Sequence, residues 1–367
     1  MDRIADRPRE GKCGPRSSEG VPRHWIALRL VAGTMRDMTP HDRLRDLVGS
    51  LPAPPLGGGA LHRLRTPATR VREGLLRRRR RALPDLTTAV GRRRRLGWIR
   101  PGFNNLGPSA AFVFRFARHH DVCVVAYACD GAPPRRLESV DGVPVPADLV
   151  GRVFAVGSPD WCVLSFEAAS DLFLRQLLAL ADGGLSDLDP EVVLGSEATF
   201  LGHSQGALEG LIVRARLVAA GLGDALGDVV AIAPPTAGST VLVGPGAGAL
   251  LRHSAGAAAG PAARQAVEAL GPGQPLEVLQ RYGASPDGFT RVVAGRIGEG
   301  GSALFRTLAW LSVRGATGWE GHSDGMVAVD SARAGVLDER FRIVEGAADH
   351  DELFEDPAVV DVALDDV

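Results

Sequence analysis

The sequence predicts an α/β protein with a mostly parallel, doubly wound sheet, and three observations lead to this fold class. From residue 96 onward, apolar runs of strand length alternate with segments of helical periodicity. Runs such as residues 121–128 and 228–233 are almost continuously apolar, which is typical of parallel strands buried on both faces. Ser204, which has a glycine two positions before it and another two positions after it, lies where an apolar run passes into an amphipathic segment.

The length and composition fit one large α/β domain with insertions. The chain has 367 residues, 45% of them hydrophobic, and its formal net charge of −1 points to no particular class of partner. The four cysteines, Cys13, Cys123, Cys129 and Cys162, show no C-x-x-C pair and no metal-ligand spacing with histidine. We therefore expect no metal and no cofactor, and we interpret Cys123 and Cys129 as buried free thiols.

The pattern of apolar and charged residues suggests neither a targeting segment nor a membrane span. No early segment combines a charged start, an apolar centre and a small-residue cleavage site. No uncharged apolar run is long enough to cross a bilayer. A cytoplasmic protein is therefore the expectation, with the start site open, because Met35 or Met38 would also begin a plausible chain.

The domain organisation is predicted from a change in composition near the start of the chain. Residues 1–60 are predicted to form an arginine-rich extension that is largely disordered, with a short helix over residues 40–51. The folded domain is predicted to span residues 61–367. Residues 236–289 are predicted to be an insertion with short helices at 260–270 and 275–282. We interpret this insertion as a mobile apolar lid, with a loosely packed surface excursion as the alternative.

Two arginine runs precede the first predicted strand, one from Arg77 to Arg81 and one from Arg92 to Arg95. We interpret them as solvated surface segments, and a weak contact with an anionic membrane is the alternative. Aromatic residues do not interleave with these arginines, and no nucleic-acid-binding pattern accompanies them. No nucleic-acid partner is therefore expected.

The predicted elements follow the alternation in order. Strands are expected at residues 96–100, 121–128, 228–233, 290–295 and 340–345, and a further strand leads into the serine motif. Helices are expected at residues 109–119, with Ser109 as the N-cap, and at residues 165–181. A third helix is expected directly after Ser204, where apolar residues recur at helical spacing, namely Leu208, Leu211, Ile212, Ala215 and Ala219.

The stretch around Ser204 has the spacing of a nucleophile elbow. In Gly202-His203-Ser204-Gln205-Gly206 a strand turns sharply into a helix, so the serine backbone is strained and its neighbours must be small. The hydroxyl is then held out of the fold at the positive end of the following helix. An ordinary turn is the alternative for this pattern alone, but the flanking strand and helix favour the elbow.

A serine hydroxyl is a poor nucleophile without a base, so a histidine and an acid are required. In a doubly wound sheet these partners follow the serine, the acid first, on loops at the carboxyl ends of later strands. Three histidines follow Ser204, namely His253, His322 and His350. His350 comes just after the last predicted strand and is therefore the predicted base.

Asp324 is the predicted acid, because it lies in a glycine-containing loop that leads toward the last strand and the base. Asp287 and Asp330 are the alternatives. Asp287 precedes a strand, and Asp330 falls where a helix would begin, which is a common place for a cap. Asp349 and Asp351 flank the predicted base and are expected to face away from its ring.

An oxyanion hole requires two main-chain N–H donors. The first predicted donor is Gln205, which directly follows the serine, and the second is Phe103, which lies in the glycine turn after the first strand. A purely structural turn is the alternative for Phe103. We also assign substrate contacts to Phe103, whose ring is expected to line the acyl side, and to Pro235.

These motifs resemble those of lipases and esterases with the α/β-hydrolase fold. The similarity covers about residues 96–355 and lies in Gly202-His-Ser-Gln-Gly206, Pro101-Gly-Phe103, Pro235-Thr-Ala-Gly-Ser239 and Ser323-Asp-Gly-Met-Val-Ala-Val-Asp-Ser-Ala332. The resemblance implies a Ser204–Asp324–His350 triad, oxyanion donors at Phe103 and Gln205, and ester hydrolysis through an acyl-enzyme. One departure is that Pro101-Gly102 stands where the family commonly has His-Gly before the oxyanion residue.

The function expected from this resemblance is that of a serine carboxylester hydrolase acting on an acyl ester of a small molecule or a lipid. Two alternatives remain open. One is an acyltransferase or thioesterase on the same fold. The other is a non-catalytic partner-binding protein whose arginine-rich front segment is the functional part.

Overall fold

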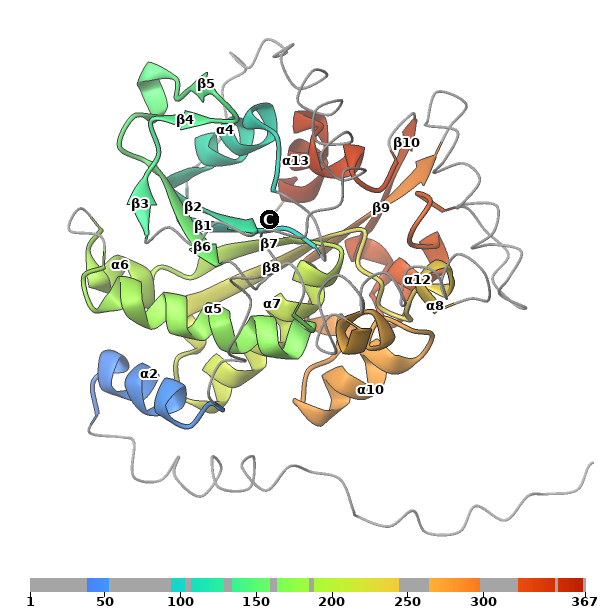
Figure 1. Ribbon diagram of the computed structural model, residues 1–367, viewed down its shortest axis with the longest axis horizontal. Helices are drawn as coiled ribbons and strands as arrows, with labels where there is room; N and C mark the ends of the chain where they lie inside the picture. Colours follow the sequence, from blue (N-terminus) through green and yellow to red (C-terminus); the bar gives the residue numbers. More distant parts are fainter. Residues whose placement is uncertain are drawn as a thin grey trace, which may run out of the picture.

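Strands and helices alternate in the part of the chain that the structure describes (Figure 1). The computed structural model describes residues 38–52, 94–102, 107–128, 134–158, 164–184, 188–243, 264–297, 323–346 and 349–365. The main sheet within them contains β1 (Arg94–Arg100), β2 (His120–Ala128), β3 (Arg135–Arg136), β6 (Val153–Ser158), β7 (Ala198–His203), β8 (Leu226–Ile232), β9 (Arg291–Ile297) and β10 (Phe341–Gly346). The two short strands β4 (Ser139–Val140) and β5 (Val143–Pro144) form a separate hairpin.

The main sheet is mostly parallel, as predicted. Its eight described strands lie in the order β10-β9-β8-β7-β1-β2-β6-β3. Each neighbouring pair among them is parallel except β3 and β6, which are antiparallel. The chain starts in the middle of the sheet at β1, builds outward to β6, and returns to β7 beside β1 before continuing to β10. The structure therefore confirms the predicted α/β fold class.

Helices cover both faces of this sheet (Figure 1). The described helices are α2 (Pro40–Gly49), α4 (Ala110–Arg118), α5 (Phe166–Ala181), α6 (Pro190–Gly195), α7 (Gln205–Ala219), α8 (Thr240–Val243), α10 (Gln274–Arg281), α12 (Val329–Arg333) and α13 (Pro357–Leu364). Helices α4 and α13 lie on one face, and α2, α5, α7 and α10 lie on the other. This is the doubly wound arrangement that crossovers between parallel strands produce.

The strands divide their side chains between two cores, one on each face. In β1, Trp98 packs with the α5 side, where its ring meets Phe173 at a centroid distance of 4.8 Å, whereas Ile99 joins the core under α4. In β7, Phe200 and Leu201 divide in the same way. Alternate residues point to opposite faces of a strand, so a strand covered on both sides must be apolar at nearly every position.

Serines cap the helices predicted at residues 109–119 and 165–181. Ser109 accepts a hydrogen bond from Phe112 N at 3.1 Å at the start of α4, and Ser165 accepts one from Ala168 N at 3.3 Å at the start of α5. Each hydroxyl satisfies an N–H group that has no acceptor inside the helix. The N-cap predicted at Ser109 is therefore confirmed.

Helix α2 packs into the core of the domain. Its side chains Leu44, Leu47 and Val48 are buried in the same core as α5. The apolar face of this helix therefore has a partner, within the segment 1–60 for which a largely disordered extension with a short helix was predicted. The predicted short helix at 40–51 is confirmed, while residues 1–37 and 53–93, with both arginine runs, lie outside the described residues.

The structure does not confirm the lid predicted for residues 236–289. The next described residues after α8 begin at residue 264 with a short helical segment, and α10 follows. This part of the chain contributes four side chains to the core that also contains α7, namely Val267, Leu270, Val278 and Leu279. It therefore packs as part of the domain and not as a mobile cover. Residues 244–263 lie outside the described residues, so a cover formed by them stays a prediction.

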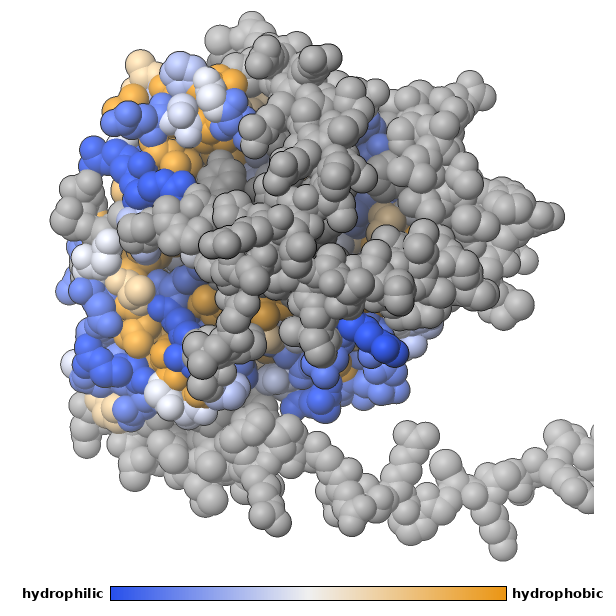
Figure 2. All heavy atoms as spheres, in the orientation of Figure 1, coloured by the Kyte–Doolittle hydropathy of each residue, from blue (hydrophilic) through white to orange (hydrophobic). Residues whose placement is uncertain are grey.

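Exposed large hydrophobic residues of the described chain are few. They are Val150, Val218, Leu337 and Ile343. In the view of Figure 2, the coloured surface mixes hydrophilic and hydrophobic residues. No helix in the described ranges has the length and apolarity needed to cross a membrane. Cys123 is a buried free thiol whose pKa is raised by burial, as predicted, and the other three cysteines lie outside the described residues.

Candidate active site

Ser204 occupies the turn between β7 and α7. Its φ of 53° and ψ of −125° lie in a region that residues with a side chain rarely adopt. The Ser204 N–H donates a hydrogen bond to the carbonyl of Ile232 at the end of β8, at 2.8 Å, which holds the turn against the sheet. The strained strand–turn–helix geometry predicted for this serine is therefore present.

The two glycines of the motif are required by close backbone contacts. A Cβ atom at Gly202 would lie 2.5 Å from the backbone of Ala207. A Cβ atom at Gly206 would lie 2.6 Å from the carbonyl oxygens of Arg100 and Pro101. Because real Cβ contacts are longer than this, only glycine permits the first turn of α7 to pack against the ends of β7 and β1.

The end of β1 meets the candidate nucleophile directly. A Cβ atom at Gly102 would lie 2.6 Å from the Cβ of Ser204 and 3.2 Å from its Oγ. The turn after the first strand therefore lies against the serine side chain. Phe103, the predicted second donor and substrate contact, is the next residue and lies outside the described residues.

Gln205 is the first residue of α7. The first N–H groups of a helix have no acceptor within the helix and carry its positive end, so they are suited to an anion. The side chain of Gln205 is buried, and its Nε2 donates to the carbonyl of Leu164 at 2.7 Å. This side-chain bond, which was not predicted, links the elbow to the segment that precedes α5.

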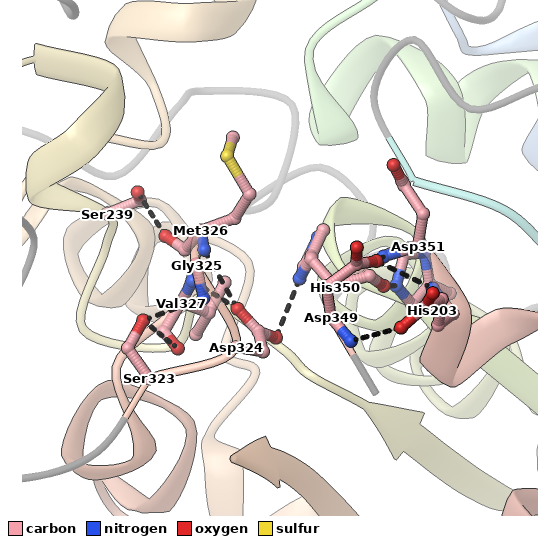
Figure 3. Close-up of polar contacts among 11 residues, drawn as sticks. His203, Ser239, Ser323, Asp324, Gly325, Met326, Val327, Asp349, His350 and Asp351 are labelled. Carbon is pink, nitrogen blue, oxygen red and sulfur yellow. Dashed lines mark hydrogen bonds and ion pairs between the residues drawn. The ribbon is translucent and has the colours of Figure 1, made fainter. Parts of the chain in front are cut away.

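Asp324 and His350 meet through their side chains (Figure 3). His350 Nδ1 lies 2.7 Å from Asp324 Oδ2, and the two residues are 7% and 1% exposed. A carboxylate can only accept, so His350 Nδ1 carries the proton of this bond and Nε2 is left as the basic nitrogen. The predicted base and the predicted acid are thus brought together in the tautomer that base catalysis requires.

The loop around Asp324 fixes its carboxylate. The second oxygen, Oδ1, accepts hydrogen bonds from the main-chain N–H groups of Met326 at 2.9 Å and Val327 at 2.8 Å. Gly325, which lies between Asp324 and Met326, has a φ of 100°, a conformation that favours glycine. Both carboxylate oxygens are therefore occupied, which sets the direction in which Asp324 faces the imidazole.

The loop after β8 is tied to this acid loop. Ser239 Oγ donates to the carbonyl of Met326 at 2.6 Å, and Ser331 Oγ donates to the carbonyl of Gly238 at 2.7 Å. Pro235 is buried in the same segment, and its carbonyl accepts from Gly238 N at 2.9 Å. The substrate contact predicted for Pro235 stays a prediction, while its segment supports the position of Asp324.

The main chain of His350 is held on both sides. Its N–H donates to the carbonyl of Asp324 at 3.0 Å, and its carbonyl accepts from Nε2 of His203 at 2.8 Å. The rings of His203 and His350 lie 4.6 Å apart, and His203 is stacked on Phe354 at 4.8 Å with an interplanar angle of 12°. The residue beside Ser204 is therefore in contact with the candidate base.

His203 is fully buried, and three influences act on its pKa. Burial lowers the pKa most strongly, and the neighbouring His350 lowers it further. The hydrogen bond to the His350 carbonyl opposes these effects, but the pKa remains well below 6.5. His203 is thus a neutral donor at neutral pH. Sequence analysis assigned it no role, although its place inside the serine motif was a usable signal.

The alternative acids lie elsewhere in the described structure. Asp330 is exposed in the first turn of α12. Asp287 lies in a short 3-10 turn before the amino end of β9, away from the carboxyl ends of the strands. Asp349 Oδ1 accepts from the N–H groups of Asp351 and Glu352 at 3.2 and 3.0 Å, so it caps the turn after the candidate base. His253 and His322 lie outside the described residues.

The arrangement contains a positioned carboxylate, a basic imidazole and a strained serine at a helix N-terminus. These groups are suited to nucleophilic chemistry at a carbonyl carbon. Among the described residues no cluster of histidine, cysteine, aspartate and glutamate has the geometry of a metal site. With Ser204 in a strained turn at the carboxyl edge of a mostly parallel, doubly wound sheet, the fold is of the α/β class predicted from the sequence.

Comparisons with known proteins identify similar solved structures. No protein-family model matches this chain, and no curated protein matches it. The mature form of Bacillus licheniformis lipase BlEst2 is similar with a TM-score of 0.45 and 16% identity, over 76% of this chain and 94% of that chain. The propeptide form of the same lipase is similar with a TM-score of 0.44 and 16% identity, over 77% of this chain and 51% of that chain.

Proposed function

We propose that this chain is a serine carboxylester hydrolase of the lipase and esterase type, with Ser204 as nucleophile, His350 as base and Asp324 as the acid that orients the base. The observation that carries the proposal is the 2.7 Å bond between Asp324 and His350, which lies at the same sheet edge as the strained Ser204 turn. A carboxylate–imidazole pair beside a strained serine is the arrangement needed to activate a hydroxyl.

The first half of the reaction forms an acyl-enzyme. His350 Nε2 takes the proton of the Ser204 hydroxyl as Oγ attacks the carbonyl carbon of the ester, and the carbonyl oxygen becomes an oxyanion. The bond between the carbon and the leaving oxygen then breaks. The alcohol leaves with the proton from His350, and Asp324 stabilises the imidazolium in between.

The second half returns the enzyme to its starting state. Water gives a proton to His350 as its oxygen attacks the acyl carbon, and the bond from this carbon to Ser204 Oγ breaks. Ser204 recovers the proton from His350, and the carboxylic acid leaves. The net change is one ester and one water converted to one acid and one alcohol.

The developing oxyanion requires donors aimed at one point. We assign this role to the main-chain N–H of Gln205 at the start of α7 and to that of Phe103. The contact between Gly102 and the Ser204 side chain supports Phe103, because the next N–H of that turn follows directly along the chain. The substrate we propose is an acyl ester of a small molecule or a lipid.

A fluorophosphonate probe and a short p-nitrophenyl ester test the proposal on the full chain. The wild-type protein should be labelled at Ser204 and should hydrolyse the ester, because both reactions need an activated hydroxyl. Ser204→Ala should lose the label and the turnover while keeping the circular dichroism spectrum. Ser139→Ala, which changes an exposed serine on β4, is the matched control and should keep both.

Two results would contradict the proposal. One is a wild-type protein that is folded but neither labelled nor active on esters of any acyl length. The other is a Ser204→Ala variant that retains turnover. A parallel series of thioesters measures whether a thioester is the better acyl donor, and an added alcohol measures transfer to an acceptor other than water.

A further inference from the structure

We propose that His203 is a positioning residue for the reaction, which holds the main chain of His350 at a set distance from the strand that carries Ser204. This inference rests on the proposed function. It concerns a residue of the serine motif whose side chain performs no step in the mechanism above.

Three hydrogen bonds locate His350, one through its side chain and two through its main chain. The side-chain bond to Asp324 determines how the imidazole is rotated, because it fixes the direction of Nδ1. The bond from His203 Nε2 to the His350 carbonyl acts on the backbone and, with the bond from His350 N to the Asp324 carbonyl, determines where the residue lies. A ring can be correctly rotated and still be misplaced, so the bond from His203 has a separate effect on the approach of His350 Nε2 to Ser204.

His203 is itself held firmly. It is the last residue of β7 and pairs in register with Ile232 of β8. Its ring is fully buried and stacked on Phe354. The ring therefore connects the central strand, which ends at the nucleophile, with the segment that carries the base. Since Ser204 is the next residue along the chain, displacement of this ring changes the relation between nucleophile and base.

The chemistry of His203 suits this role. A donor is needed opposite a carbonyl oxygen, so Nε2 must carry a proton. Burial keeps the ring neutral, since the pKa is well below 6.5. A neutral ring also avoids charge repulsion with the imidazolium that forms on His350 during the reaction, because the two rings are only 4.6 Å apart.

Two substitutions separate the hydrogen bond from the packing. His203→Phe keeps an aromatic ring against Phe354 and removes the donor. His203→Gln loses the ring but places an amide N–H near the position of Nε2. If the bond positions His350, the phenylalanine variant should lose activity and the glutamine variant should recover a large part of it.

The experiment measures kcat and KM for a short p-nitrophenyl ester, together with the rate of fluorophosphonate labelling and the melting temperature. For His203→Phe we expect kcat and the labelling rate to fall on the order of 10²-fold, the loss typical of a misplacement of about 1 Å, with KM nearly unchanged. His203→Gln should lose much less kcat, whatever its melting temperature.

His120→Phe is the matched control for the loss of a buried histidine. His120 is fully buried at the start of β2, its Nδ1 lies 3.0 Å from the carbonyl of Phe116, and its ring is stacked on that phenylalanine. This change should alter stability and leave kcat at the wild-type value, because His120 lies at the amino end of its strand.

Several outcomes overturn the inference. One is wild-type kcat in a folded His203→Phe variant, and another is a glutamine variant that is no better than the phenylalanine variant. If His203→Phe does not fold, His203→Gln is compared with His203→Asn, whose amide is too short to reach, and equal kcat values overturn the inference. A wild-type protein without ester turnover or labelling would instead overturn the proposed function.

Discussion

Ser204 holds a backbone conformation that is costly for a residue with a side chain, and its neighbours keep it there. Strain of this kind costs about 1–3 kcal/mol and persists only where surrounding contacts over-determine it. Here the contacts are the bond from Ser204 N to Ile232 O and the close approach of Gly202 and Gly206 to the adjacent backbone. The strain is useful because it directs the hydroxyl away from the capping position that a serine before a helix normally takes.

In the proposed mechanism Asp324 acts only through His350, so replacing its charge tests its role without removing an atom that takes part in a proposed step. Asp324→Asn places an amide opposite Nδ1 and favours the tautomer in which Nε2 carries the proton. We expect kcat to fall by about 10⁴-fold, as in other triads with this change. Steady-state kinetics with the p-nitrophenyl ester measures the loss.

Asp330→Asn is the control for Asp324→Asn, because Asp330 lies six positions further along the chain and is exposed on α12. Its activity should remain at the wild-type level. The assignment of the acid is wrong if Asp330→Asn or Asp287→Asn abolishes turnover while Asp324→Asn keeps it.

A buried ion pair joins β1 to α7, the helix that follows Ser204. Arg100 donates two hydrogen bonds to Glu209 Oε1, from Nε at 2.9 Å and from Nη2 at 2.6 Å. Its Nη1 donates a third, to Gln176 Oε1 at 2.9 Å. Both charged side chains are 1% exposed. The same junction includes the close contact of Gly206 with the carbonyl oxygens of Arg100 and Pro101. The helix after Ser204 and the strand that ends at the Pro101-Gly102 turn are therefore joined by a polar network and by backbone packing.

Glu209→Gln removes the charge of the carboxylate to which the buried Arg100 donates twice. Glu209→Gln should therefore lower the free energy of unfolding by about 3–5 kcal/mol. Guanidinium chloride unfolding followed by circular dichroism measures the change. The matched control is Asp338→Asn, which removes the partner of Arg333 in a pair whose side chains are 51% and 77% exposed.

Exposed ion pairs contribute little to stability, so the midpoint of Asp338→Asn should be close to that of the wild type. If Glu209→Gln is as stable as Asp338→Asn, the buried pair does not hold the junction. The double variant Arg100→Met with Glu209→Leu should be more stable than Glu209→Gln, because it leaves no unpaired charge in the core.

The molecule as a whole assembles the site at one edge of its sheet. Gly102 follows β1, Ser204 follows β7 and Pro235 follows β8. Asp324 belongs to a loop joined to the end of β9 by the bond from Ile297 N to Ser323 O, and His350 follows β10. The carboxyl ends of parallel strands lie at the same edge, so residues far apart in the chain become neighbours.

His203 makes the stability of the whole fold depend on pH. Its pKa is lowered in the folded state, so below pH 6.5 the unfolded chain binds a proton that the folded chain does not. Stability should therefore fall as the pH drops below 6.5, and continue to fall until the pH reaches the lowered pKa. One such group contributes at most about 1.4 kcal/mol per pH unit.

Unfolding in guanidinium chloride at pH 7.5, 6.5 and 5.5 checks this dependence, with His203→Gln as the comparison. His119, whose pKa is also lowered by burial, titrates in both proteins, so the difference between their slopes isolates His203. The glutamine variant should lose less stability than the wild type between pH 6.5 and 5.5. Equal slopes would show that His203 does not titrate in this way.

Much of the fold could be predicted because its signals are local. The serine at position 109 caps its helix through a residue three positions away, and the apolar run of β8 reflects burial on both faces. Strand β6 was not predicted, although Val153-Phe-Ala-Val156 is apolar, because the run is short and no periodic helix directly precedes it. The partners of α2 and α10 in the core were not predicted, because a short amphipathic pattern does not identify its partner.

The backbone geometry of the Ser204 turn, the helix caps and the buried strands could be predicted from the chain alone, because those interactions join near neighbours or follow the period of a strand. The bonds that assemble the site join residues far apart, with separations of 26 positions for Asp324 and His350 and 147 for His203 and His350. Arg100 and Glu209 are 109 positions apart. Such contacts depend on the order of the strands and on the placement of loops to within a fraction of an ångström, and this placement results from the packing of the whole sheet.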